Sequence, residues 1–285
     1  MFDLRYHVAS LAAVFIALVI GILVGVGISG RGLIRESERA VLQDRIDQLR
    51  DQLDETREAG RATDALSAYE RETYPLVMEG RLAEGRIAVV YVGSAEGPLA
   101  ADIRETLDRA DATLVRTVAL KVPIETGDLL RRVPSAPDAP QTVEALGRAL
   151  ADELVDGGDT PHWDAVDSVL VEERDGGTRT PIGGVVVART GDPQRGQTAR
   201  FLAGFYGGLA ASGVPVVGVE TTEADPSAVD TYRSHGFSTV DHLDTAMGRV
   251  ALAVLLEGNE RGAFGIRDGV DGALPNVEPV PPPSG

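Results

Sequence analysis

One short polar segment near the C-terminus carries the residues best suited to chemistry. Asp241, His242 and Asp244 lie close together, and an imidazole between two carboxylates can hold a metal ion or relay a proton. The segment also has a structural interpretation, because an apolar helix at 244–257 follows it and either Asp241 or Asp244 is a suitable N-cap. The pattern favours capping, and the three residues stay secondary candidates for a metal or catalytic site.

Two strand ends carry the other candidate side chains. Ser94 lies in the turn 93–97 after an expected strand at 87–92, and Arg189 follows another expected strand. Ligands bind at the carboxyl ends of parallel strands, so both residues are candidates for ligand binding. The turn at Ser94 matches neither the dinucleotide-binding glycine pattern nor the nucleophile elbow, and is typical of an ordinary strand-to-helix turn. Arg189 is able to hold an anion or to form a salt bridge with Asp192.

Residue types that bind soft metals are scarce. Cu(I) favours cysteine and methionine sulfur, but the chain has no cysteine. Its methionines are Met1, Met78 and Met247, and Met247 falls on the apolar face of the helix at 244–257. The histidines, which show no close metal-ligand spacing, are His7, His162, His235 and His242. The sequence therefore predicts no resident metal, no cofactor and no disulfide, and we expect a non-catalytic protein.

An α/β domain, expected at residues 84–268, must position these candidates. Short apolar runs alternate with helical segments, which argues for a doubly wound, mostly parallel sheet covered on both faces. The expected strands are 87–92, 113–118, 182–188, 214–219 and 237–240, and the expected helices are 98–110, 125–132, 141–155, 196–212 and 244–257, with a Pro-rich link at 134–140. Residues 269–285 are rich in proline and are expected to be disordered.

The N-terminal segment, residues 1–30, reads as a membrane anchor. From Val8 to Ile28 there are 21 consecutive residues without a charge. A helix of that length spans about 31 Å, which is the thickness of the hydrocarbon core of a bilayer. Gly30 leads directly into a charged helical segment, a pattern that favours a retained single-pass anchor over a cleaved signal peptide.

Two patterns predict a homodimer through the anchor and the stalk, residues 31–78. Small residues recur at every fourth position of the anchor, which favours close helix pairing in lipid, and they include Ala13, Ala17, Gly21 and Gly25. The stalk carries apolar residues with the spacing of a coiled-coil seam, namely Leu42, Ile46, Leu49 and Leu53. A single amphipathic helix packed on its own domain is the alternative. Pro75 is expected to end the helix.

The charge balance bears on partners and on orientation. The chain carries 27 basic and 44 acidic residues, a net charge of −17, which disfavours binding to nucleic acid. Arginines are more frequent after the apolar segment than before it, and counted alone they favour a cytoplasmic C-terminal domain. They are Arg5 on the N-terminal side and Arg31, Arg35, Arg39 and Arg45 on the other.

Three segments carry a resemblance to a known family. The N-terminus, Met1–Phe15, is similar to the mycobacterial copper-transport protein B (MctB-like) family, and the segments 238–252 and 262–265 resemble the C-terminal region of that family. With the anchor, the stalk and the α/β domain in the same order, the resemblance covers nearly the whole chain. It implies an actinobacterial cell-envelope protein, linked to copper efflux, whose C-terminal domain is extracytoplasmic.

Three functional hypotheses follow. The first is a non-catalytic, membrane-anchored envelope protein of this copper-linked family. The second is a dimeric extracytoplasmic scaffold or regulator of cell-wall enzymes or of cell separation, with an envelope protein as partner and no metal transport. The third is an enzyme or a small-ligand-binding domain that works at the C-terminal edge of the sheet.

Overall fold

A computed structural model of the 285-residue chain describes the backbone of residues 4–133, 139–176 and 180–279. The chain divides into two compact units, Met1–Tyr69 and Glu70–Gly285. Residues 134–138 of the expected link at 134–140 fall outside the described residues, as does the end of the chain from residue 280.

The described residues of the N-terminal unit belong to one long helix, α1 (Leu4–Met78). Its segment His7–Gly27 has 21 residues with a mean hydropathy of 2.8, has no buried residue, and is long and apolar enough to cross a membrane. The expected pairing residues Ala13, Ala17, Gly21 and Gly25 are all exposed on it.

The stalk residues on the expected seam are described only in part. Leu49 and Leu53 are 58% and 50% exposed, large values for leucine. The side chains of Leu42 and Ile46 lie outside the described residues. The single chain therefore leaves the described half of this apolar seam uncovered.

The prediction that Pro75 ends the helix is wrong, since α1 continues to Met78. Proline removes only one backbone N–H, and the partner that loses this bond is the carbonyl of the exposed Arg71, which water can solvate. The following turn is held by packing, because Val77 and Met78 join the apolar core of the C-terminal unit.

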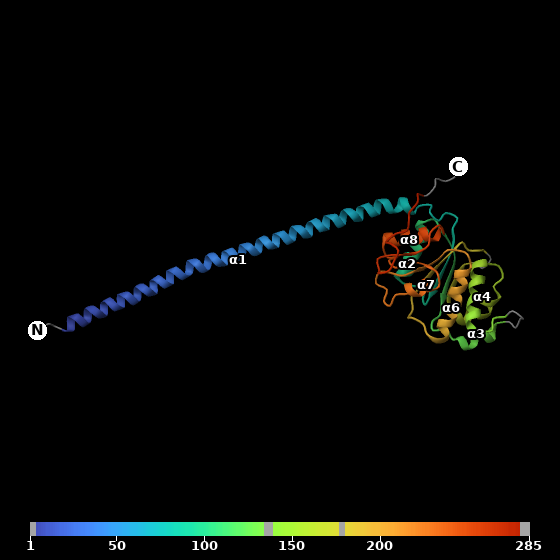
Figure 1. Ribbon diagram of the computed structural model, residues 1–285, viewed down its shortest axis with the longest axis horizontal. Coiled ribbons are helices and arrows are strands. Elements are labelled where there is room, and N and C mark those ends of the chain that lie inside the picture. The colour runs from blue at the N-terminus through green and yellow to red at the C-terminus, as the bar shows by residue number, and fades with distance from the viewer. Residues whose placement is uncertain (1–3, 134–138, 177–179, 280–285) are drawn as a thin grey trace. The chain divides into compact units, whose positions relative to one another are not determined.

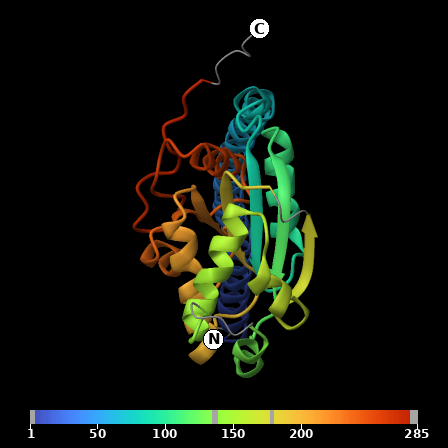
Figure 2. The ribbon, with the colours of Figure 1, turned by 90° about the vertical axis from the view of Figure 1, so that its right-hand side faces the viewer.

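In the described part of the chain, a seven-stranded sheet forms the centre of the C-terminal unit. Its strands are β1 (Arg86–Val92), β2 (Thr113–Leu120), β3 (Val171–Gly176), β4 (Gly184–Arg189), β5 (Val216–Val219), β6 (Ser238–Val240) and β7 (Ala263–Phe264). The strand order is β3-β2-β1-β4-β5-β6-β7, and only the pair β2–β3 is antiparallel. Figure 2 shows β3, in yellow, at one edge of the sheet. The expected mixed α/β class with a mostly parallel sheet is confirmed.

Helices cover both faces of this sheet. They are α2 (Pro98–Arg109), α3 (Thr126–Arg132), α4 (Val143–Asp156), α5 (Pro161–Leu170), α6 (Gly196–Ala211), α7 (Val229–Ser234) and α8 (Ala246–Leu256). Alternate residues of β1 face opposite cores. Ile87, Val89 and Tyr91 belong to the core with α2 and α8, whereas Ala88, Val90 and Val92 belong to the core with α4, α5 and α6.

The helices α4 and α6 lie side by side (Figure 1) and approach each other through glycine. A methyl group on Gly204 of α6 would overlap the backbone carbonyl of Glu144, and one on Gly147 of α4 would overlap the carbonyl of Phe201. The two backbones are therefore in direct contact, which leaves no room for any larger residue.

The C-terminal segment differs from expectation. Residues 269–279 do not behave as a free tail: Gly272 bridges to Phe264, Leu274 packs against the core with α8, and Asn276 donates its N–H to Glu260 at 2.9 Å. Arg81 binds the same segment, because its Nη2 donates to the carbonyl of Glu278 at 2.9 Å while Nη1 pairs with Glu257 at 2.8 Å. The Pro-rich composition suggested disorder, but these contacts fix the chain locally.

Candidate functional site

Asp241, the first residue of the polar cluster after β6, has a structural role. The buried carboxylate of Asp241 accepts the backbone N–H of Ile266 at 2.9 Å and that of Arg267 at 3.0 Å, one on each oxygen. Any side chain at Gly265 would overlap this carboxylate. Asp241 therefore holds the turn that follows β7.

His242 is fully buried and has an unusual environment. Its Nδ1 lies 3.2 Å from Asp241 Oδ1, but the direction of approach does not allow a hydrogen bond, and among the described residues neither ring nitrogen has a hydrogen-bond partner. The ring is sealed from solvent by the protein. It is therefore unable to act as a base toward a substrate outside.

Asp244 points to a different loop. It accepts the backbone N–H of Thr222 at 2.8 Å and the Thr222 hydroxyl at 2.5 Å. Burial raises the pKa of Asp244, but the hydrogen bonds from Thr222, together with the backbone of Asp244 and the nearby His242, outweigh it and leave the pKa below its ordinary value. Asp244 thus ties the start of α8 to the loop after β5.

The predicted N-cap is wrong in identity. Thr245, not Asp241 or Asp244, caps α8, because its Oγ1 accepts the backbone N–H of Gly248 at 3.1 Å. The two carboxylates are instead occupied by backbone groups of other loops. Among the described residues, no three side chains of His, Cys, Asp or Glu come together as a metal site.

The other sulfur and imidazole groups are scattered. Met78 is buried at the end of α1, whereas Met247, expected to face the core, is 38% exposed. His162 Nδ1 lies 2.6 Å from Glu153, and His235 Nδ1 lies 2.9 Å from the carbonyl of Thr231. These side chains come from different elements and point to different partners.

A cavity with polar and apolar walls lies at the carboxyl ends of β1, β4 and β5. It has a volume of about 370 Å³ and is bounded by the loops 96–99, 189–193 and 220–228. The strands β1 and β4 are neighbours in the sheet, but the chain continues from β1 to β2 on one side and from β4 to β5 on the other. Ligands commonly bind where the strand order reverses in this way. The cavity is therefore the best candidate site for a ligand.

Of the two ligand candidates predicted here, only Arg189 lines the cavity. Ser94 instead supports the neighbouring turn: its Oγ accepts the backbone N–H of Glu96 at 3.1 Å, and its carbonyl accepts the Thr190 hydroxyl at 2.7 Å. The turn at Ser94 is thus a structural strand-to-helix connection.

Arg189 is held by a backbone contact and not by the expected alternative, a salt bridge with Asp192. Its Nη2 donates to the carbonyl of Pro226. Two buried tyrosines, Tyr206 and Tyr232, lie near it; burial raises the pKa of both phenols, and the charge of Arg189 opposes this rise only in part. The Tyr232 hydroxyl is close to the backbone of Arg189 but has no hydrogen-bond partner among the described groups.

The third wall of the cavity was missed from the sequence. Glu220, directly after β5, is buried and accepts the Ser227 hydroxyl and the Ala228 N–H, both at 2.7 Å. Arg267 Nε lies 3.1 Å from the same carboxylate. The available signal was the position of Glu220 at the end of an apolar strand, the same position that marks Ser94 and Arg189 as candidates.

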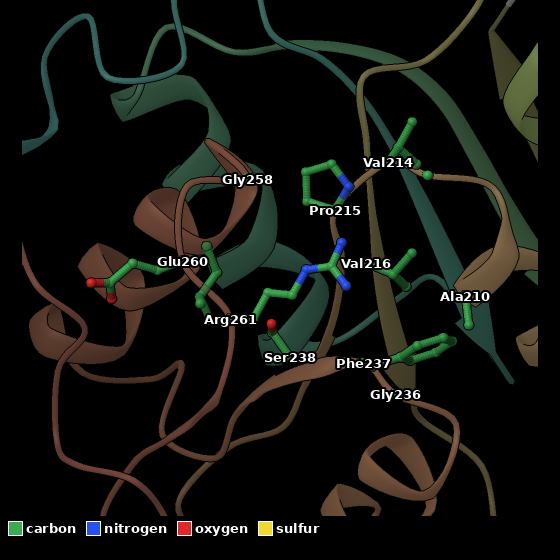
Figure 3. Close-up of a pocket in the computed structure, with 12 residues that line it drawn as sticks. Ala210, Val214, Pro215, Val216, Gly236, Phe237, Ser238, Gly258, Glu260 and Arg261 are labelled. Carbon is green, nitrogen blue, oxygen red and sulfur yellow. The ribbon is translucent and has the colours of Figure 1, made fainter.

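A second hollow lies at the opposite ends of β5 and β6 (Figure 3). The Arg261 side chain reaches toward Pro215, while Glu260 points away from it. The hollow measures about 60 Å³, far below the size of an ordinary small-molecule pocket. The hollow is therefore too small to hold a ligand of that kind.

Comparison with known proteins identifies the family of the chain. Residues 1–275 match the family described as "Copper transport outer membrane protein, MctB". Proteins named "Copper transporter MctB" from Mycobacterium bovis and from two strains of Mycobacterium tuberculosis are each 27% identical over 309 residues, which cover 94% of this chain and 98% of each relative. The match covers the apolar helix, the stalk and the α/β unit alike, and it confirms the resemblance noted in the sequence. The chain therefore belongs to the MctB family of copper transport proteins.

Proposed function

We propose that this protein is a single-pass, membrane-anchored envelope protein that contributes to copper tolerance without catalysis. The observation that carries the proposal is the family match along residues 1–275, from the apolar helix to the last strand. The relatives are named copper transporters, and the helix His7–Gly27 is apolar and long enough to serve as the anchor. Together these support a membrane or envelope location.

A non-catalytic role is supported by the structural hydrogen bonds of the polar side chains at the strand ends. The hydroxyls and carboxylates at the strand ends, such as Thr190, Asp241 and Asp244, are bound to backbone groups, and His242 is sealed inside. A helix can satisfy its own backbone in lipid, but one helix cannot enclose a pore. Copper handling by this chain would therefore involve several copies or another membrane protein.

An extracytoplasmic C-terminal domain is part of the proposal, and it rests on the family. The arginine count after the anchor favours the opposite side of the membrane. A cysteine-reactive, membrane-impermeant label on a Ser284→Cys variant tests it directly, because the native chain has no cysteine. Labelling in intact cells is expected; labelling only after lysis would place the domain in the cytoplasm.

Copper tolerance is tested by deletion in the organism that encodes the chain. We expect the deletion to lower the copper concentration that stops growth by about twofold or more, and the intact gene to restore it. A gene lacking residues 7–27 serves as the control for anchoring and should fail to restore tolerance. A role in copper handling would be refuted if the deletion strain kept its copper sensitivity unchanged and the full-length protein bound no copper in a titration.

A dimeric scaffold for cell-wall enzymes is the second candidate function. The observation in its favour is the exposure of Leu49 and Leu53, four residues apart on one side of α1, where a second helix would cover them. A coiled-coil stalk on a doubly wound domain would hold two recognition surfaces at the membrane. Capture of cell-wall hydrolases by the full-length protein, with normal copper tolerance in the deletion strain, would favour this function over the first.

The stalk dimer predicts a specific mutational result. Leu49→Asp places a charge on the proposed seam, so we expect full-length protein in detergent to change from dimer to monomer in light scattering. Gln48→Asp adds the same carboxylate one position away, outside the seam, and should remain dimeric. A monomeric parent protein, or equal behaviour of the two variants, would contradict pairing through the stalk.

A further inference from the structure

The cavity at the carboxyl ends of β1, β4 and β5 has a charge pattern that points to a ligand class. Its one lining cation is Arg189, at the end of β4. Arginine has five N–H donors, and the hydrogen bond to Pro226 uses Nη2. Its other N–H groups can receive a carboxylate in a paired, charge-assisted contact.

The rim of the cavity carries the opposite charge. Glu96, Asp192 and Asp225 are exposed carboxylates on three separate loops, and no ion pair holds any of them within the described ranges. The fourth acidic residue, Glu220, is already compensated by Arg267. The uncompensated lining charges are therefore one positive group and three negative groups.

This distribution selects against simple ions. A ligand with only negative groups would meet three carboxylates, and a ligand with only positive groups would meet Arg189. A ligand with both a carboxylate and an ammonium group satisfies the two ends together. Pro98, Leu99 and Pro226 add apolar surface for the carbon skeleton between them.

We propose that this cavity binds a small zwitterion, a free amino acid or the end of a short peptide, with its carboxylate on Arg189 and its ammonium group toward the acidic rim. The volume of about 370 Å³ is at the lower end of the range for small-molecule pockets, roughly 300–1,000 Å³, which fits a ligand of this size. The site is independent of copper handling and of the anchor, so it stands whether or not the function proposed above is correct.

Binding is tested on the full-length protein in detergent by calorimetry. The probes are L-alanine, L-lysine and L-alanyl-L-alanine, with the N-acetylated and the C-amidated dipeptide as blocked forms. We expect saturable binding of at least one free zwitterion and an affinity loss of about tenfold or more in both blocked forms, because each lacks one charge. Binding of amino acids alone identifies a free amino acid, and binding of the dipeptide as well identifies a peptide end.

Variants locate the binding site. Arg189→Gln should weaken binding by about tenfold or more, and Asp225→Asn should weaken it less, since other carboxylates remain. Arg195→Gln removes an exposed arginine from the same loop outside the cavity lining and should bind normally. If Arg189→Gln fails to fold, the double variant Asp192→Asn/Asp225→Asn, made at exposed positions, tests the acidic rim. Absence of saturable binding for all three probes, or equal binding of the blocked dipeptides, would overturn the proposal.

Discussion

Gly204→Ala is expected to lower the free energy of unfolding of the C-terminal unit by about 3 kcal/mol, although alanine favours helices more than glycine does. The added methyl group would overlap the backbone carbonyl of Glu144 in α4. A backbone atom cannot move aside as a flexible side chain can, so the two helices must separate and expose part of the core that contains Phe201 and Phe205.

The matched control lies on the same helix. Gly207 has no heavy atom within 4 Å of the position where a methyl group would be added. Gly207→Ala should therefore show only the gain in helix propensity, up to about 1 kcal/mol of added stability. Fluorescence of Trp163, the single tryptophan, reports unfolding in urea from within the same core. Equal effects of the two substitutions would mean that α4 and α6 are not in backbone contact.

The pattern of apolar residues along the chain explains why the main elements could be predicted. The buried strands β1, β4 and β5 are continuous apolar runs rich in valine, and the helices between them have clear apolar faces. Within the α/β unit, both ends of every expected strand and helix lie within two residues of those of an observed element. The family match then confirmed what the N-terminal segment resembled.

Elements with a weak apolar pattern were missed. β3 is an edge strand of sequence Val-Glu-Glu-Arg-Asp-Gly, and most of its side chains are exposed, so it shows no buried run. The helix α7 and the strand β7 are too short for periodicity to be detected. The helix α5 was also missed but could have been predicted, because Thr160 and Pro161 form a recognisable helix start.

The contacts of the site residues could not be predicted from local sequence patterns. Arg189 and Ser94 were found because strand ends are recognisable in sequence, but their contacts involve Pro226 and Thr190, which only the fold brings near. The apolar face after Asp244 correctly indicated a helix, but both predicted caps, Asp241 and Asp244, precede the observed capping residue Thr245. The role of Asp241 depends on residues 266 and 267, whose approach no local pattern reveals.

Asp241→Ala is the second substitution with a large expected effect, a loss of about 3 kcal/mol in the free energy of unfolding. The variant leaves the backbone N–H groups of Ile266 and Arg267 without their acceptor at a site where the carboxylate is buried. Asp241→Asn should also be destabilising, because an amide presents an N–H group to one of these two donors. Urea unfolding followed by Trp163 fluorescence measures both effects.

Asp244→Ala separates this structural role from a metal site. Asp244 is exposed and its two side-chain oxygens accept hydrogen bonds from Thr222, so its loss should cost less than about 1 kcal/mol. If Asp241, His242 and Asp244 instead shared a metal ion, both alanine variants would lose stability to a similar degree, and added Zn²⁺ or copper would stabilise only the parent protein. The divergent hydrogen bonds of the two carboxylates favour unequal losses that are insensitive to metal, since a ligand set must converge on one point and these side chains hold two different loops.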